Sequence, residues 1–143
     1  MRKLLILLAL IGGCNSESNE PVRHDSSTII KTDGGIEIQT NGFDIPSTAD
    51  IDAWYEEVEE CIGYPTNETP VISFTDGIED ICNVSDSGCY LAGLEIIAIS
   101  STAPDVKRTL KHEFIHHDLY MNDYPPELEI NHQPDFIWNC QHH

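Results

Sequence analysis

The part of this sequence best suited to chemistry is a group of histidines late in the chain. The stretch LKHEFIHHDL contains the pattern His-Glu-x-x-His, formed by His112, Glu113 and His116. Side chains four residues apart lie on one face of a helix, about one turn from each other. Two imidazoles placed in this way can bind one metal ion, and a carboxylate beside them can accept and donate protons. We therefore interpret these residues as two metal ligands and a general base.

The next histidine in the stretch, His117, is expected to have a different role. Successive helical residues diverge by about 100°, so it cannot easily share an ion with His116. It also continues an apolar stripe of the same helix, which favours a position in the core or behind the ligands. The stripe consists of Val106, Leu110, Phe114, His117 and Met121.

The motif lies where the sequence predicts a helix that follows a strand. Residues 101–105, STAPD, supply cap candidates, an early proline and an acidic residue, all typical of a helix start. Before them, residues 94–99, LEIIAI, are typical of a β-strand. With this strand and helix, the sequence resembles the zincin superfamily of metallopeptidases over roughly residues 71–140.

The zincin resemblance implies that Zn²⁺ is the cofactor and that an edge strand before the active-site helix lines the substrate cleft. His112 and His116 would bind the zinc, Glu113 would activate the attacking water, and a third ligand would follow downstream. A peptide or protein substrate is expected to lie extended along residues 94–100 and to add a strand to the sheet.

The motif itself leaves the third ligand open. A metzincin would have glycine and histidine where this chain has Leu119 and Asn122, so that class is excluded. The preferred candidate is His132, because NHQPDF (131–136) resembles the histidine, short spacer and phenylalanine of SprT-like and some small exported lipoprotein zincins. The remaining candidates are Glu127, Glu129, His142 and His143.

Two tyrosines after the motif are further candidates for the site. Tyr120 and Tyr124 lie within twelve residues of Glu113 in the sequence. A tyrosine hydroxyl near a zinc ion can stabilise the oxyanion that forms during amide hydrolysis. Packing of the tyrosine ring in the core is the competing explanation.

The first fourteen residues are typical of an export signal. Arg2 and Lys3 precede an apolar run over residues 4–11, which is shorter than the roughly 20 residues of a membrane-spanning helix. The sequence Ile-Gly-Gly-Cys that follows resembles the lipobox of bacterial lipoproteins, which implies a signal peptide over 1–13 and a lipid on Cys14. We therefore expect an exported protein anchored by lipid in the bacterial cell envelope, at the outer membrane or cell surface rather than the inner membrane. The alternative is an ordinary secretory signal.

The four cysteines after Cys14 are an even number, as expected for disulfides in an oxidising compartment. Three pairings are possible. We favour Cys82 with Cys89, because the residues between them are typical of a tight loop, and by elimination Cys61 with Cys140. A four-cysteine metal site is the rival interpretation, but the chain has no C-x-x-C pair.

The charge of the chain argues against nucleic acid as a partner. The 143 residues include 25 acidic side chains and 7 Lys or Arg, with a formal net charge of −18. Such a field repels phosphate backbones. We therefore expect a peptide or protein substrate, contact with a membrane through the lipid anchor, and no nucleic acid.

The remaining regular elements predict an α+β fold. Alternation around Asp33-Gly34-Gly35 predicts a hairpin over 28–40, and residues 70–75 predict a strand. A helix is predicted from 47 to 62, ended by Gly63, with a packed face of Ile51, Trp54, Tyr55, Val58 and Ile62. Beyond Tyr120, three prolines and no clear period predict a loop.

These elements give a domain organisation and a function to test. We expect a flexible polar tether over 14–27 and a zincin-like domain over 28–143, with a small mixed or antiparallel sheet packed on two main helices, the second carrying the motif. The function implied is zinc-dependent peptide-bond hydrolysis. The competing functions are those of a non-catalytic zinc-binding envelope lipoprotein, or of an acidic, disulfide-stapled module that binds a protein and carries the motif by accident.

Overall fold

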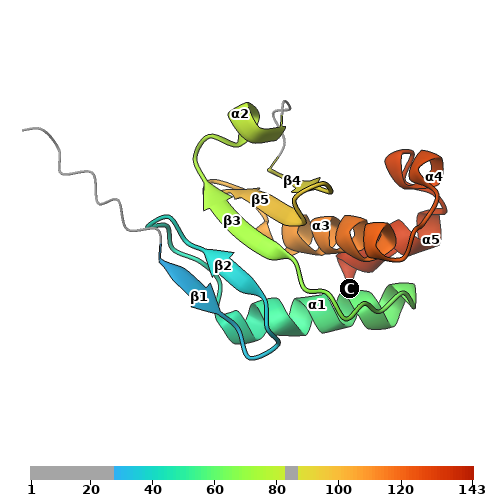
Figure 1. Cartoon of the computed structure of the whole chain (residues 1–143), viewed down its shortest axis with the longest axis horizontal. Coiled ribbons are helices and arrows are strands. Elements are labelled where there is room, and N and C mark those ends of the chain that lie inside the picture. Colours follow the sequence, from blue (N-terminus) through green and yellow to red (C-terminus); the bar gives the residue numbers. More distant parts are fainter. Residues whose placement is uncertain (1–27, 83–86) are drawn as a thin grey trace, which may run out of the picture.

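The computed structural model describes residues 28–82 and 87–143 (Figure 1). The predicted signal peptide, the lipidated Cys14 and the tether over 14–27 lie outside the described residues. None of the helices in the described ranges has the length and apolar character needed to cross a membrane. The elements are, in chain order, β1 (Ile29–Lys31), β2 (Glu37–Gln39), α1 (Thr48–Ile62), β3 (Val71–Thr75), α2 (Ile78–Cys82), β4 (Gly88–Leu91), β5 (Ile96–Ser100), α3 (Val106–Met121), α4 (Pro126–Ile130), α5 (Asp135–Trp138) and the 3-10 helix η1 (Asn139–His142).

The described strands form one mixed sheet in the order β1-β2-β3-β5-β4. The three inner strands are parallel, while β1 and β4 are antiparallel edge strands. Ile38, Ile72 and Ile97 lie side by side across the inner strands, and all three are fully buried. This row belongs to the same core cluster as the packed residues of α1 and α3, so it joins the sheet to the helices.

The predicted hairpin and both long helices are confirmed. β1 pairs with β2 across a turn in which Gly35 has a positive φ of 98°, a conformation that glycine adopts without steric cost. α1 is preceded by the N-cap Ser47, whose side chain accepts the Asp50 N–H at 3.1 Å, and is followed by Gly63 in the left-handed conformation. α1 and α3 pack against each other beside the sheet (Figure 1).

The strand predicted over 94–99 is confirmed as β5, which begins at Ile96, but its expected position at the edge of the sheet is wrong. The structure has two strands here, β4 and β5, separated by a turn in which Glu95 has a φ of 55°. β5 is hydrogen-bonded on both sides, to β3 and β4, so a peptide cannot add to it as we expected. An apolar run is compatible with either a central or an edge strand, and only the pairing shows that the edge strand is β4.

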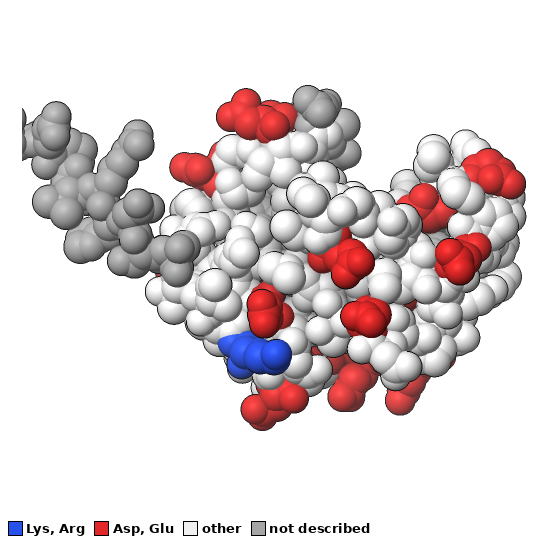
Figure 2. All heavy atoms as spheres, viewed as in Figure 1, with Lys and Arg blue, Asp and Glu red and all other residues white. Residues whose placement is uncertain are grey.

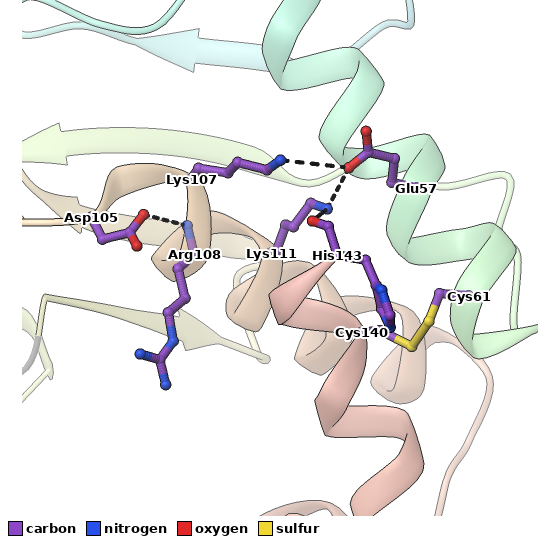
Figure 3. A network of polar contacts seen from close by, with 8 residues as sticks. All are labelled: Glu57, Cys61, Asp105, Lys107, Arg108, Lys111, Cys140 and His143. Atoms are coloured by element: carbon purple, nitrogen blue, oxygen red, sulfur yellow. Dashed lines mark hydrogen bonds and ion pairs between the residues drawn. A yellow bond between two sulfur atoms is a disulfide. The ribbon is translucent and has the colours of Figure 1, made fainter.

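The segment after Tyr120, predicted as loop, contains three short helices, α4, α5 and η1. Helices of four or five residues are too short to show a hydrophobic period, which is why the pattern missed them. We call residues 122–143 the tail. The tail packs along α3, and a disulfide from Cys140 to Cys61 holds it to α1 (Figures 1 and 3). The second disulfide joins Cys82 to Cys89, so both predicted pairings are confirmed.

Candidate metal centre

Three predicted ligands, His112, His116 and His132, meet at one point. One possible ligand atom from each lies within 4.8 Å of the other two, and their ring centroids are 4.9 to 5.4 Å apart. Nitrogens about 2.1 Å from a tetrahedral ion would be about 3.4 Å apart, so small ring movements suffice to close the site. The residues therefore fit a single metal ion. Imidazole ligands suit zinc, copper, iron and nickel, so the metal type does not follow from the ligands alone.

The two helix histidines have oxygen partners on their Nδ1 atoms. His116 Nδ1 contacts the Glu129 carboxylate, and His112 Nδ1 lies 3.1 Å from Gln141 Oε1. A ring nitrogen engaged in this way leaves Nε2 for the metal, and such partners commonly hold metal-binding histidines in orientation. Glu129, a candidate for the third ligand, therefore contacts the candidate ligand His116 in this structure. Glu127, a candidate from the same segment, has an exposed side chain on α4.

His132 lies in an unusual backbone position for its residue type. Its N–H donates to the Glu129 carbonyl at 3.0 Å, and the Gln133 N–H donates to the Leu128 carbonyl at 2.8 Å. These bonds form a Schellman motif that ends α4, with His132 at the left-handed position (φ 53°) usually taken by glycine. A side chain here costs about 1 kcal/mol of strain. A strained residue beside a candidate site is the pattern expected where the side chain has a function.

Trp138 forms the apolar floor of the histidine cluster. Its ring centroid lies 5.2, 4.7 and 4.2 Å from those of His112, His116 and His132, respectively. The side chain is buried, and its Nε1 has no hydrogen-bond partner among the described residues. Trp138 was not among the residues predicted from the sequence. The sequence signal that could have identified Trp138 was its place between His132 and Cys140, two residues that were expected to lie near the helices.

Burial and repulsion from neighbouring histidines favour the neutral forms of His112 and His132. Burial, followed by the nearby His116 and His132, lowers the pKa of His112 to about 4. The pKa of His132 is also lowered, first by burial and then by His116. A histidine must be neutral to bind a metal through its ring nitrogen, so both effects favour the metal-binding form.

Glu113 lies between two neighbouring depressions that together form a cleft. The histidine depression, about 390 Å³, contains the three histidines and also Tyr90 of β4. The second, about 400 Å³, contains Arg108, and we call it the arginine depression. Glu113, His112 and Gly88 line both. The predicted general base is thus buried, with 5% of its surface exposed, lies next to the candidate ligand His112 in the chain, and lines both depressions.

The two predicted oxyanion tyrosines lie in different places. Tyr120 lines the histidine depression and is half-exposed. The Tyr124 hydroxyl donates to the Gln133 carbonyl at 3.1 Å, and its ring packs against Tyr64. Tyr124 lines another depression, so the geometry does not favour an oxyanion role for it.

His117 connects α3 to β4 from the buried side of the helix. Its Nε2 lies 2.8 Å from the Glu68 carbonyl, which can only accept, so Nε2 carries the proton. Nδ1 therefore accepts from the Tyr90 hydroxyl at 3.2 Å. His117 is fully buried, as expected for a histidine behind the ligands. Tyr90 was not predicted from the sequence because β4 was not, so this link between helix and edge strand was also missed.

Asp118 makes a second buried link, between α3 and α1. Its Oδ1 accepts a hydrogen bond of 2.9 Å from the Tyr55 hydroxyl. Burial raises the pKa of Asp118 to about 8, since a charged carboxylate is poorly solvated here. The same burial, with Asp118 nearby, raises the pKa of Tyr55. This pair fixes the helix that carries the motif against the other main helix.

No protein-family model matches the chain, and no curated protein or solved structure is significantly similar to it. An α+β fold with a mixed sheet serves many unrelated activities, so the architecture alone assigns none. The function has to be argued from the cluster of three histidines and from Glu113 beside it.

Proposed function

We propose that this protein is a zinc-dependent metallopeptidase. His112, His116 and His132 would hold the ion, and Glu113 would act as general base and acid. The observation that carries the proposal is the convergence of three imidazoles, with one possible ligand atom from each within 4.8 Å of the others, and a buried carboxylate on the same helix. The His-Glu-x-x-His pattern and its resemblance to zincins support the same reaction class.

The number of ligands favours catalysis over a purely structural site. Structural zinc sites are normally closed by four protein ligands, whereas catalytic sites have three and leave one position open. Three histidines form the cluster among the described residues. Glu113 adds a carboxylate where a structural site has no need of one, at the junction of two depressions large enough for part of a substrate.

The reaction would divide between the ion and the protein. A bound zinc ion supplies Lewis acidity, which acidifies water and polarises a peptide carbonyl. Glu113 would accept a proton from the attacking water and donate it to the leaving amine. Tyr120, at the rim of the histidine depression, is the candidate to donate a hydrogen bond to the developing oxyanion.

The edge strand β4 offers a place for the peptide. Gly88 lines both depressions, while Cys89 and Tyr90 line the histidine depression, so β4 forms one wall of the cleft. Its described partner is β5 alone, and its other edge faces away from the sheet. An extended peptide can hydrogen-bond to such an edge as an additional strand. This replaces our expectation that the peptide would lie along residues 94–100.

The test compares hydrolysis with metal content in three proteins. Zinc-loaded wild type, Glu113→Gln and Glu127→Gln are incubated with a reduced and alkylated unfolded protein. Glu127→Gln is a matched control, because it makes the same chemical change on an exposed side chain of α4. We expect Glu113→Gln to retain about one zinc per chain and to lose at least about 100-fold in activity. The control should match the wild type.

Two results would overturn the proposal in different ways. If the wild type binds one zinc and cleaves nothing, the protein is a non-catalytic zinc carrier. If the metal-stripped protein takes up no zinc, the motif is accidental and a protein-binding module is favoured.

We also propose that the protein is exported and lipid-anchored through Cys14. The two disulfides support an oxidising compartment, because such bonds are rare in the reducing cytosol. Cys14→Ala should move the protein from the membrane fraction to the soluble fraction of cells that express it. Membrane association that is unchanged in this variant would exclude a lipid on Cys14.

A further inference from the structure

The basic side chains of this acidic protein have unequal environments. Among the residues that the structure describes, three lysines are paired with carboxylates: Lys31 with Glu37 at 3.7 Å, Lys107 with Glu57 at 3.9 Å, and Lys111 with Glu57. Arg108 forms no ion pair with a carboxylate of the described ranges. Acidic side chains are spread widely over the face seen in Figure 2, and basic atoms occupy little of it. An arginine without a described carboxylate partner is therefore an exception in this molecule.

Arg108 lies at one end of the cleft. It is one helical turn before His112 on α3, and it lines the arginine depression with His112 and Glu113. Its backbone N–H donates to the Asp105 side chain at 3.0 Å, which fixes the start of the helix. Figure 3 shows that the Arg108 side chain extends away from Glu57, toward which Lys107 and Lys111 point. The guanidinium is thus separate from the ion pairs that join α3 to α1.

The opposite end of the cleft is lined by exposed apolar and aromatic side chains. Tyr120 and Ile130 line the histidine depression, and they are 48% and 71% exposed. Exposed apolar side chains at the rim of a depression suit an apolar group of a ligand. The cleft is therefore polarised, with a cation at the Arg108 end and apolar surface at the Ile130 end.

The direction of β4 relates this polarity to the direction of a bound peptide. β4 runs from Gly88, which lines both depressions, to Tyr90 in the histidine depression. Antiparallel pairing is slightly more stable than parallel pairing. A peptide antiparallel to β4 would enter at the apolar end and run toward Arg108. The part of the peptide on the C-terminal side of the cleaved bond would then reach the guanidinium.

We propose that Arg108 is a specificity-determining residue that binds a carboxylate in the C-terminal part of the peptide substrate. This inference rests on the proposed peptidase function and adds the class of substrate. Arginine suits the role because its planar guanidinium donates two parallel hydrogen bonds to one carboxylate. The carboxylate can belong to an Asp or Glu side chain or to the end of the peptide chain. Acidic side chains elsewhere on the surface repel such a group. Asp105 and Glu113 also line the arginine depression, and Asp105 Oδ1 accepts the Arg108 backbone N–H, so the guanidinium is the group in this depression that attracts a carboxylate.

The test is a cleavage profile on two libraries of random decapeptides, one with free and one with amidated C-termini. The zinc-loaded full-length wild type, Arg108→Gln and Lys107→Gln are compared by mass spectrometry of the products. Lys107→Gln is the matched control, since it removes the same charge from the adjacent helix position outside the arginine depression. Zinc content should be the same in all three, and the unfolding midpoints should differ only slightly, since the Lys107–Glu57 ion pair is exposed; this separates specificity from folding.

We expect the wild type to favour acidic over amide side chains after the cleaved bond, or free over amidated C-termini, by about tenfold or more. The first pattern assigns a side-chain carboxylate and the second a chain terminus. Arg108→Gln should lose the preference, Arg108→Lys should retain part of it, and Lys107→Gln should retain it fully. A profile that is unchanged in Arg108→Gln would overturn the inference.

Failure of the proposed function can be recognised separately. If the wild type cleaves neither library, the peptidase proposal fails, and binding then tests Arg108. Zinc-loaded Glu113→Gln, with and without Arg108→Gln, is immobilised and used to capture peptides from the same libraries. Enrichment of acidic or free-terminus peptides that depends on Arg108 supports carboxylate binding, and capture without that dependence excludes it.

Discussion

The two regions that supply the histidine cluster, α3 and the tail, hold their residues by different means. In α3 the relation between His112 and His116 follows from local hydrogen bonds of a 16-residue helix. In the tail, His132 follows a five-residue helix and depends on contacts with distant parts of the chain. The relative position of the two candidate ligands on the helix is therefore set by local structure, whereas that of the third candidate depends on the complete fold.

The tail also determines how the helix ligands are oriented. Both oxygen atoms that contact the Nδ1 atoms of His112 and His116 come from the tail, from Gln141 and Glu129, respectively. Trp138, which packs against all three rings, comes from the same segment. A regular helix can thus place two candidate ligands on one face, while an irregular segment orients their rings and adds the third histidine of the cluster.

Among the predicted changes, removal of the disulfide that holds the tail should lower the free energy of unfolding most. The Cys61 to Cys140 bridge spans 79 residues, and the Cys82 to Cys89 bridge spans seven. In the chain-entropy account, these loops contribute about 4.5 and about 2.5 kcal/mol to the free energy of unfolding. Urea unfolding of the two double Cys→Ser variants measures both. The first variant should also lose more zinc affinity, and equal losses of stability would contradict the dependence on the tail.

The next largest expected change is in zinc affinity, after substitution of the tail residues that contact the rings of His112 and His116. Glu129→Ala should weaken zinc binding by about 10- to 100-fold, as is typical for partners of metal-bound histidines. Gln141→Ala should have a smaller effect, because a neutral amide makes a weaker hydrogen bond than a carboxylate. Competition with a chromophoric chelator gives the affinities. Glu127→Ala is the control on the same short helix and should bind zinc like the wild type.

The same substitution at two ligands should change the stability of the metal-free protein in opposite directions. His132→Gly relieves a left-handed side chain and should raise the free energy of unfolding by up to about 1 kcal/mol. His116→Gly places glycine inside α3 and should lower it by about 0.5 kcal/mol or more. Both variants should lose zinc binding. Destabilisation by His132→Gly in denaturant titrations would mean that its contacts outweigh the backbone strain.

The smallest expected change is in the thermal midpoint, after loss of the ion pair between Lys111 of α3 and Glu57 of α1. The fully buried Lys111 donates to Glu57 and, at 2.6 Å, to the backbone oxygen of His143 (Figure 3). The hydrogen bond from Lys111, with its charge, lowers the pKa of Glu57 from its usual 4.5. The resulting stability is present above this usual pKa and is lost as the pH falls through the lowered value.

Glu57→Gln should therefore lower the thermal midpoint at pH 7 and converge with the wild type as the solution becomes acidic. The change should be modest, because the Glu57 side chain is 47% exposed to solvent. Glu56→Gln, an exposed neighbour on α1, is the control. A difference from the wild type that stays constant with pH would show that the ion pair is not its cause.

The sequence by itself was sufficient for the features that depend on short separations. Periodicity and caps predicted α1 and α3, and a spacing of four placed His112 and His116 on one face. The hairpin followed from alternation around a glycine turn, and the short spacing of Cys82 and Cys89 favoured the disulfide that the structure has between them. These features are set by hydrogen bonds and chain closure among residues close in sequence.

The tertiary structure decided which distant residues join them. It selected His132 from several candidates, added Trp138 and Gln141, and moved Glu129 to a supporting position. It also made β4 the edge strand of the cleft. His116 and Glu129 are 13 residues apart in the sequence, and His112 and Gln141 are 29 apart. No backbone period relates positions so far apart. Such relations depend on how short helices and a disulfide pack the tail against α3, which only the folded chain defines.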